Sequence, residues 1–190
     1  LVDAPDEPLP ASGFGALTQR SPIAKPMIAA VNGYAMGGGF EIALCCDLIL
    51  ASSEAVFALS EPKVGAVALQ GGPQRLLRRL PHYIAMEMLL TGRRMGPEEA
   101  QRWGLVNHVT PAGGDLMATA LEWAGRVLDC APASLGHTKM LALQRLEGED
   151  FVASIGEDRA AIADQLFKSH DLHEGIAAMR EKRKPQWTGR

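Results

Sequence analysis

The stretch NGYAMGGGFEIALCCDL, from Asn32 to Leu48, sets three consecutive glycines directly before a strongly apolar run. Glycine inside a helix costs about 1 kcal/mol relative to alanine, so three in succession need a reason. Between a strand end and a helix start, glycines let the backbone approach a ligand, with free N–H groups at the positive end of the helix dipole. Phosphates and the oxyanion that develops on a carbonyl are the two ligand classes that use such a turn.

The flanking segments predict an α/β arrangement. An apolar run at 26–31 ends in an Asn-Gly pair, which is typical of a buried strand closed by a turn. The residues FEIALCCD, 40–47, predict a short helix, LILAS, 48–52, predicts a second buried strand, and 57–59 begin a further extended segment. The order strand, helix, strand implies a crossover and a parallel pair of strands.

The second half of the chain has helical periodicity, punctuated by glycine and proline. A brief strand is expected at 105–110, and helices are expected after Gly72 and at 83–91, 97–103, 116–128, 133–146, 151–166 and 172–183.

These patterns divide the chain into a loop or linker at 1–24, an α/β core with active-site loops at 25–112, and a helical region at 113–190. The opening LVDAPDEPLP shows no periodicity, and the first residue is Leu rather than Met. We therefore expect the chain to start part-way through a longer protein.

Composition excludes several partners. A net charge of −3 and a pI near 6.0 argue against nucleic acid or an anionic membrane as a partner of the whole surface. No apolar stretch is long enough for a membrane span. The five histidines lack metal-ligand spacing, so no metal site is expected. Cys45 and Cys46 lie in an apolar run and are interpreted as buried free thiols in a reducing compartment, the cytoplasm.

Carboxylates near the glycines favour the oxyanion hypothesis. No Lys-Ser/Thr follows the glycines and the run does not fit G-x-G-x-x-G, so phosphate binding is weakly supported. Glu41 falls in the first helical turn, and Glu61 follows the next extended segment. If the two parallel strands are neighbours, both glutamates face one cavity at the carboxyl ends of the strands. Against this, the glycines could serve tight packing, with Glu41 a surface residue that complements the helix dipole.

Five segments together resemble the enoyl-CoA hydratase/isomerase (crotonase) family. They are KPMIAAVNGYAMGGGFEIALCCDLILAS (25–52), FALSEPKVG (57–65), GGPQRL (71–76), AMEMLLTGRRMGPEEAQRWGLVNHVTP (85–111) and FKSHDLHEGIAAMREKRKPQWTGR (167–190). The resemblance implies a crotonase-like α/β fold, the ClpP/crotonase spiral core of short strands and helices, with a helical C-terminal trimerisation region.

The resemblance also implies a role for each motif position. A coenzyme A thioester would place its carbonyl in an oxyanion hole that includes the backbone N–H of Gly38. Glu41 would hold and activate water, and Glu61 would exchange the proton at the α-carbon. Gly37 and Leu69 would contact the substrate. No cofactor is implied, because coenzyme A is part of the substrate and the thioester itself acidifies the α-carbon.

Two departures from the family pattern concern specificity and completeness. The family's second oxyanion donor comes from an upstream Phe-x-Ala/Gly-Gly-x-Asp-like segment, and 1–24 contain none. After Glu61 the chain reads GAVALQGG, 65–72, with Leu69 in the place of a glycine. This second departure favours a specialised acyl group, as in a carnitinyl-CoA dehydratase.

The sequence therefore predicts a lyase of the enoyl-CoA hydratase type in fatty acid metabolism, acting on 2-enoyl-CoA or 3-hydroxyacyl-CoA. A double-bond isomerase that uses Glu61 alone stays open, and so does a catalytically silent scaffold or binding protein. A Ser-His-Asp hydrolase is disfavoured because no G-x-S-x-G elbow is present.

The C-terminal segment predicts assembly. Leu172, Ile176 and Met179 make an apolar stripe at helical spacing, which must cover its own domain or a neighbour. The resemblance favours a homotrimer or hexamer, with Trp187 partly buried. The basic run REKRK, 180–184, is either a solvated helix end or a contact for CoA phosphates, with Lys182 as the residue concerned.

Overall fold

A computed structural model describes residues 10–20, 23–64, 66–144 and 168–189. These residues fall into two compact units. The first comprises 10–20 and 27–121 without residue 65, and the second comprises 23–26, 122–144 and 168–189. No helix within the described ranges is long and apolar enough to cross a membrane.

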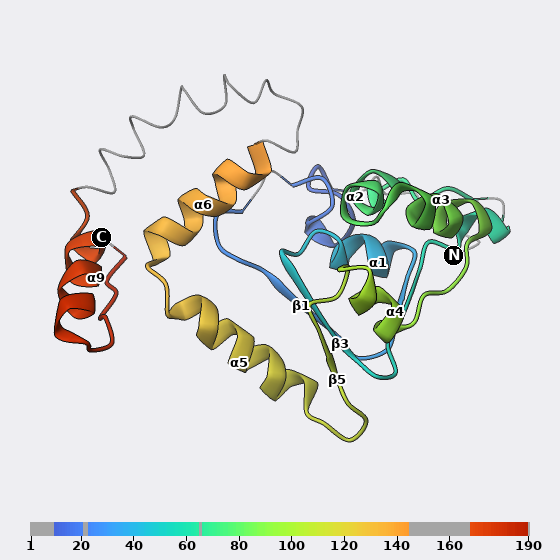
Figure 1. The fold of residues 1–190 in the computed structure, drawn as a ribbon. Helices are drawn as coiled ribbons and strands as arrows, with labels where there is room; N and C mark the ends of the chain where they lie inside the picture. Colours follow the sequence, from blue (N-terminus) through green and yellow to red (C-terminus); the bar gives the residue numbers. More distant parts are fainter. Residues whose placement is uncertain (1–9, 21–22, 65, 145–167, 190) are drawn as a thin grey trace. The chain divides into compact units, whose positions relative to one another are not determined.

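The central sheet of the first unit is parallel, as the sequence predicts. Its strands are β1 (Ile28–Val31), β3 (Leu48–Ser52) and β5 (His108–Thr110), in the order β1-β3-β5 (Figure 1). Ile28 pairs with Leu48 and Leu50 with His108. The side-chain amide of Asn107 extends this pairing, because its Oδ1 accepts the N–H of Ile49 at 2.9 Å.

A second, two-stranded parallel sheet leads directly to the glycine turn. It pairs β2 (Tyr34–Met36) with β4 (Val56–Ala58), and Met36 lies opposite Ala58. The sequence patterns do not predict β2, because three residues are too short to show a period and Tyr34 is exposed. Its partner β4, more than a dozen residues away in the chain, supplies the hydrogen bonds that make it a strand.

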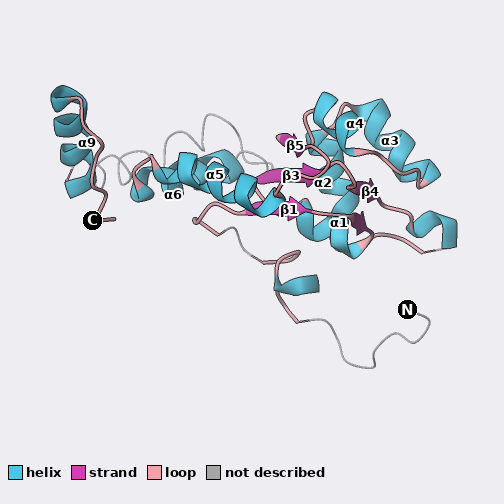
Figure 2. Ribbon diagram, turned by 90° about the horizontal axis from the view of Figure 1, so that it is seen from below, coloured by secondary structure: helices cyan, strands magenta, loops and turns pink. Residues whose placement is uncertain are grey.

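Short helices α1 to α4 lie on the same side of the β1-β3-β5 sheet in both ribbon views (Figures 1 and 2). The sequence explains their limits. Pro97 is the first residue of α4, where its missing N–H costs no hydrogen bond. Gly92 ends α3 in the left-handed conformation, with φ +57°. The helices are α1 (Gly38–Ala43), α2 (Gly72–Arg79), α3 (His82–Thr91) and α4 (Pro97–Arg102), and two 3₁₀ turns are η1 (Phe14–Ala16) and η2 (Glu61–Val64).

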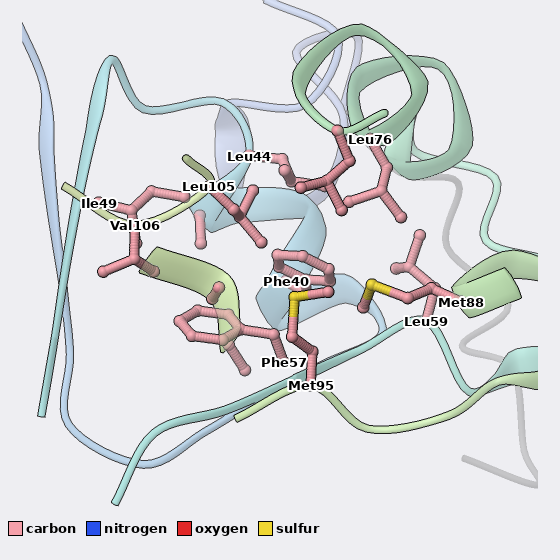
Figure 3. Packing of buried hydrophobic residues seen from close by; sticks show 14 of the residues in the cluster. Phe40, Leu44, Ile49, Phe57, Leu59, Leu76, Met88, Met95, Leu105 and Val106 are labelled. Atoms are coloured by element: carbon pink, nitrogen blue, oxygen red, sulfur yellow. The ribbon is translucent and has the colours of Figure 1, made fainter. Parts of the chain in front are cut away.

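The hydrophobic core holds α1 against these elements. Phe40 of α1 and Phe57 of β4 are fully buried, with ring centroids 5.4 Å apart (Figure 3). Met88 and Met95 pack into the same cluster. Burial of a side chain of this size contributes about 1.5–3 kcal/mol, so the core fixes the helix that carries Glu41.

The regular secondary structure described in the second unit is helical. Helix α5 (Leu116–Leu128) contributes its residues from 122 onward, followed by α6 (Pro132–Gln144) and α9 (His170–Glu181). The helix predicted around 151–166 lies outside the described residues. Trp187 is half-buried, as predicted, because its ring packs on Gly175 and its Nε1–H donates to the carbonyl of Asp129 at 3.3 Å.

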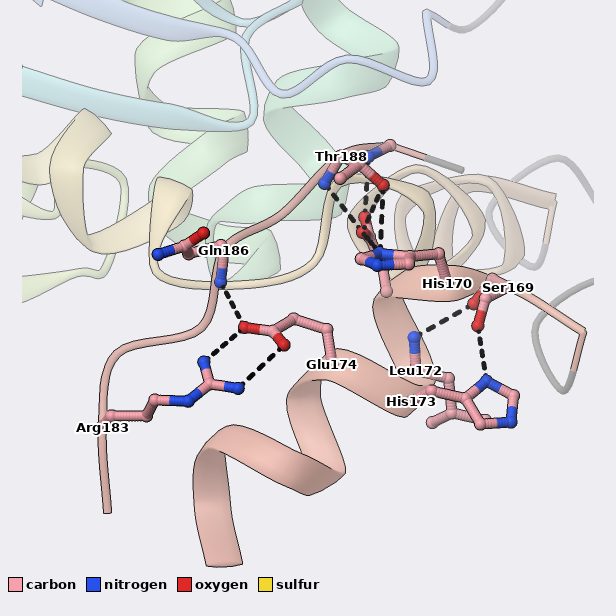
Figure 4. A network of polar contacts seen from close by, with 10 residues as sticks. Ser169, His170, Leu172, His173, Glu174, Arg183, Gln186 and Thr188 are labelled. Atoms are coloured by element: carbon pink, nitrogen blue, oxygen red, sulfur yellow. Dashed lines mark hydrogen bonds and ion pairs between the residues drawn. The ribbon is translucent and has the colours of Figure 1, made fainter. Parts of the chain in front are cut away.

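Carboxylates fold the C-terminal tail back on α9 (Figure 4). Glu174 accepts two bonds from the Arg183 guanidinium, at 2.6 and 3.0 Å, and one from the N–H of Gln186 at 2.7 Å. The arginine bond and then the backbone bond lower the pKa of Glu174 from 4.5 to about 2. Asp171 is buried, which favours its protonated form, but bonds from the N–H groups of Thr188 and Gly189 hold its pKa below the ordinary value.

The tail is therefore expected to loosen in acid. A carboxylate with a lowered folded-state pKa stabilises the fold fully above its unfolded value, here 4.5, and loses that contribution as the pH falls towards about 2. Glu174→Gln should lower the free energy of unfolding at pH 6, and the difference from the native chain should vanish near pH 2. Urea unfolding across this range measures it, with Glu98→Gln, an exposed position, as the control. A pH-independent difference would contradict the assignment.

Candidate active site

The site begins where β2 ends. Gly37 has φ +52°, a conformation that side chains disfavour, and its N–H donates to the carbonyl of Ala58 at 2.9 Å. The carbonyl of Gly37 accepts the N–H groups of Phe40 and Glu41, both at 2.9 Å. Within the described part of the chain, no backbone acceptor receives the N–H of Gly38. The turn thus leaves a backbone donor available at the start of α1.

Glu61 packs directly on this turn. It opens η2, three residues after β4, and its Oε1 lies 3.0 Å from the point where a Cβ on Gly37 would stand. Its Oε2 is buried and has no hydrogen-bond partner among the described residues. A buried carboxylate oxygen without a donor carries a desolvation cost of about 1–3 kcal/mol or more. A buried polar atom without a partner needs an explanation, and a catalytic role is one that fits its place beside the glycine turn.

Glu41 is held differently. Its side chain is buried, with an exposed fraction of 3%. Its Oε1 accepts two backbone N–H groups, from Gln70 at 2.8 Å and from Gly72 at 2.9 Å. A Cβ on Gly72 would stand 2.9 Å from Cγ and Oε1 of Glu41, so this glycine is required by the carboxylate. Glu41 is therefore a fixed, buried group and not the surface residue of the packing hypothesis.

The strands that bring the two glutamates to the turn are not those that the sequence patterns suggest. The sequence predicts that the strands at 26–31 and 48–52 are neighbours, and these strands do pair as β1 and β3. The glycine turn and Glu61 follow β2 and β4 instead, and these two strands are also parallel neighbours. The juxtaposition of the two loops holds because parallel pairing places both carboxyl ends at one edge.

Leu69 and Lys182 belong to different units. Leu69 is 77% exposed in the loop before α2, one residue before Gln70. Lys182 belongs to the other unit and is exposed. It has φ +53° just after α9, and the N–H of Arg183 donates to the carbonyl of Ala178 at 3.1 Å, so Lys182 occupies the position where helices usually end in glycine.

Three residues of the site are not apparent from the sequence patterns. A Cβ on Gly38 would stand 2.7 Å from Cε1 of Phe14, so this ring covers the middle glycine. Gln70 and Gly72 supply the amides that hold Glu41. Phe14 lies in a segment without periodicity, and backbone donors leave no signal in side-chain chemistry. In the sequence, the pair Gly71-Gly72 is the only indication that the backbone comes close to another group here.

The thiols beside α1 are unremarkable. Cys45 and Cys46 form no disulfide and are half-buried, less buried than predicted. The Cys45 thiol donates to the carbonyl of Glu41 at 3.1 Å, and burial raises its pKa against the opposing charges of Arg75 and Arg79. Among the described residues, no group of three His, Cys, Asp or Glu side chains is arranged to hold a metal ion.

Comparison with known proteins agrees with this geometry. The family model described as enoyl-CoA hydratase/isomerase matches residues 10–190. The chain is 43% identical to a carnitinyl-CoA dehydratase from Proteus mirabilis and 42% identical to one from Escherichia coli O157:H7, covering 99% of this chain and 72% of each relative. Among solved structures it is similar to the enoyl-CoA hydratase EchA1 of Mycobacterium marinum, with a TM-score of 0.88 and 38% identity over 95% of this chain and 72% of that chain.

A solved carnitinyl-CoA hydratase from Mycobacterium avium is also similar. It is 40% identical with a TM-score of 0.68, covering 95% of this chain and 69% of that chain. These likenesses confirm the crotonase-like fold that the sequence predicts.

Proposed function

Because the chain belongs to the enoyl-CoA hydratase/isomerase family, we propose that it adds water to a 2-enoyl-CoA or removes it from a 3-hydroxyacyl-CoA. The observation that carries the proposal is the pair of glutamates at the glycine turn. Among the described residues, no donor reaches the buried Oε2 of Glu61 beside Gly37, and Glu41 is fixed by two amides. An isomerase needs a single proton-transfer group, so a second, fixed carboxylate favours hydration.

The proposed mechanism assigns one role to each group. The N–H of Gly38 donates to the thioester oxygen and stabilises the enolate that forms there. Oε1 of Glu41 is engaged by both amides, which leaves Oε2 to hold the water whose oxygen bonds to C3. Glu61 delivers the proton to C2 in hydration and removes it in dehydration. The thioester acidifies the α-carbon, so the proposal requires no metal, nicotinamide or flavin.

For the acyl group we propose a carnitinyl-type substrate. The two relatives above are named for carnitinyl-CoA, and Leu69 stands where a glycine is usual. Carnitine carries a trimethylammonium group, and aromatic faces bind such cations. Phe14, which covers Gly38 and is 43% exposed, provides such a face.

Steady-state kinetics test both levels of the proposal. The substrates to compare are crotonyl-CoA and its 4-trimethylammonio derivative, the dehydration product of carnitinyl-CoA. Hydration of the cationic thioester with the higher kcat/KM is expected. Equal values would remove the acyl-group proposal and keep the hydratase. Double-bond migration without hydration would favour the isomerase, and binding without turnover would favour the silent scaffold.

We further propose a homotrimer or hexamer in which Lys182 lies near a CoA phosphate. An exposed apolar side chain on α9, Ile176 at 39%, supports assembly. Sedimentation at micromolar concentration should show the oligomer, and a fully active monomer would contradict it.

Lys182→Gly removes the charge and suits the left-handed backbone. This variant should raise KM for CoA thioesters with little change in kcat, because a contact to the CoA phosphate stabilises the bound substrate and the transition state equally. An unchanged KM would leave Lys182 a solvated helix end.

A further inference from the structure

The loop that holds Glu41 is itself held by a segment near the start of the chain. The side-chain oxygen of Gln70, Oε1, receives three donors from that segment. They are the hydroxyl of Thr18 at 2.9 Å, Nε2 of Gln19 at 3.2 Å and the backbone N–H of Phe14 at 3.3 Å. Thr18 is buried, with 3% of its surface exposed. One side-chain oxygen therefore accepts hydrogen bonds from three residues of the segment at 14–19.

Arg75 closes the same connection from the other side. Its guanidinium donates to the carbonyl of Thr18 at 2.7 Å and to the carbonyl of Gln70 at 2.9 Å. The guanidinium also lies against Gly71, whose φ of +86° gives the loop its sharp turn into α2. The side chains of Gln70 and Arg75 thus link the segment at 14–19 and the loop at 70–72 through five hydrogen bonds.

The backbone of Gln70 carries this connection to the carboxylate. Its N–H donates to Oε1 of Glu41 at 2.8 Å, the shorter of the two bonds that Glu41 receives. We propose that Gln70 is a positioning residue for the water step. Its side-chain oxygen anchors the loop to 14–19 so that its N–H holds Glu41 where the carboxylate directs water to C3. This inference rests on the proposed hydratase function.

Two substitutions of Gln70 can separate the role of its side-chain oxygen from that of its volume. Among the described residues, the hydrogen bonds of the Gln70 side-chain amide all go to its oxygen, which acts as an acceptor. Glutamate has the same length and accepts the same three donors, whereas leucine fills a similar volume and accepts none. If Gln70 positions Glu41 through this oxygen, Gln70→Glu should retain the function that Gln70→Leu loses.

The experiment separates the water step from proton exchange. In Gln70→Leu, kcat for hydration should fall about tenfold because a small displacement of a catalytic group has a large effect, while KM should change less. Exchange of the α-proton of a bound acyl-CoA in deuterated water depends on Glu61 and should be nearly retained. Gln70→Glu should be close to native in both. Gln74→Leu, the same substitution at an exposed position on α2, is the matched control.

Each outcome decides the matter. Equal loss of hydration and exchange in Gln70→Leu, or the same loss in Gln70→Glu, would overturn the positioning role. If Gln70→Leu does not fold, Thr18→Val removes one donor at nearly constant volume and should lower hydration in preference to exchange. No such preference would again overturn the inference. If the native protein exchanges the α-proton but hydrates nothing, the proposed function fails, and that result is visible before any variant is made.

Discussion

Glu61→Gln is expected to lower turnover by about 100-fold or more, the usual scale for the loss of an acid–base group. The amide cannot take up or release the α-proton, yet it fits the same space beside Gly37. In the native protein, the buried Oε2 of Glu61 receives no donor from the described residues, so replacing this atom removes no hydrogen bond to it. Thermal stability should therefore stay near native or rise, and activity and stability should separate.

Glu41→Gln is expected to affect hydration more than α-proton exchange, unlike Glu61→Gln. The amide retains an oxygen for the N–H groups of Gln70 and Gly72, so the backbone around it is preserved. Hydration of the enoyl-CoA should be crippled, while α-proton exchange in deuterated water should survive better than in Glu61→Gln. The measurement is hydration rate against deuterium incorporation by mass spectrometry for both variants. Mild and equal effects of the two changes would refute the two-carboxylate mechanism.

Gly38→Val should abolish activity while the circular dichroism spectrum stays near native. Even the first carbon of the new side chain would meet the Phe14 ring at 2.7 Å, and the branched methyl groups would keep the thioester oxygen away from the N–H of Gly38. Loss of one oxyanion donor costs about 2.7–4 kcal/mol in the barrier. Phe14 is 43% exposed and can turn aside, so the fold should tolerate the change better than the chemistry does.

Gly33 offers the control for this experiment. It lies in the turn before β2, and a Cβ there would have no heavy atom within 4 Å. Gly33→Ala should therefore keep both structure and activity. Activity in Gly38→Val comparable to that of Gly33→Ala would mean that the triple glycine serves packing alone.

The parts of the fold that could be predicted from sequence are those with a local signal. The strand at 48–52 and the helix at 116–128 appear with the predicted limits because apolar runs and punctuation mark them. The turn at Gly37 and the two glutamates are marked by residue type. Strand β2 could not be found, since its three residues become a strand only by pairing with β4.

The residues that support the site could not be predicted from the sequence for a related reason. Gln70 acts on Glu41 through its backbone, and Phe14 reaches Gly38 from a segment with neither period nor motif. Contacts between distant segments are set by the packed fold, and a single sequence carries no record of them. Residue chemistry therefore singles out Glu41 and Glu61, the proposed catalytic pair, but not the backbone groups that hold Glu41.

At three glycines of the site, another side chain lies where a Cβ of the glycine would stand. Glu61 fills the place of a side chain on Gly37, Phe14 that on Gly38, and Glu41 that on Gly72. Evolution of a new acyl specificity on this scaffold is therefore constrained unevenly. A change of side chain at Phe14 or Leu69 leaves in place the backbone N–H groups of Gln70 and Gly72 that hold Glu41, whereas any side chain gained at Gly37 or Gly72 displaces a glutamate. Under the proposed mechanism, the residues that hold the two glutamates are thus more constrained than those expected to contact the acyl group.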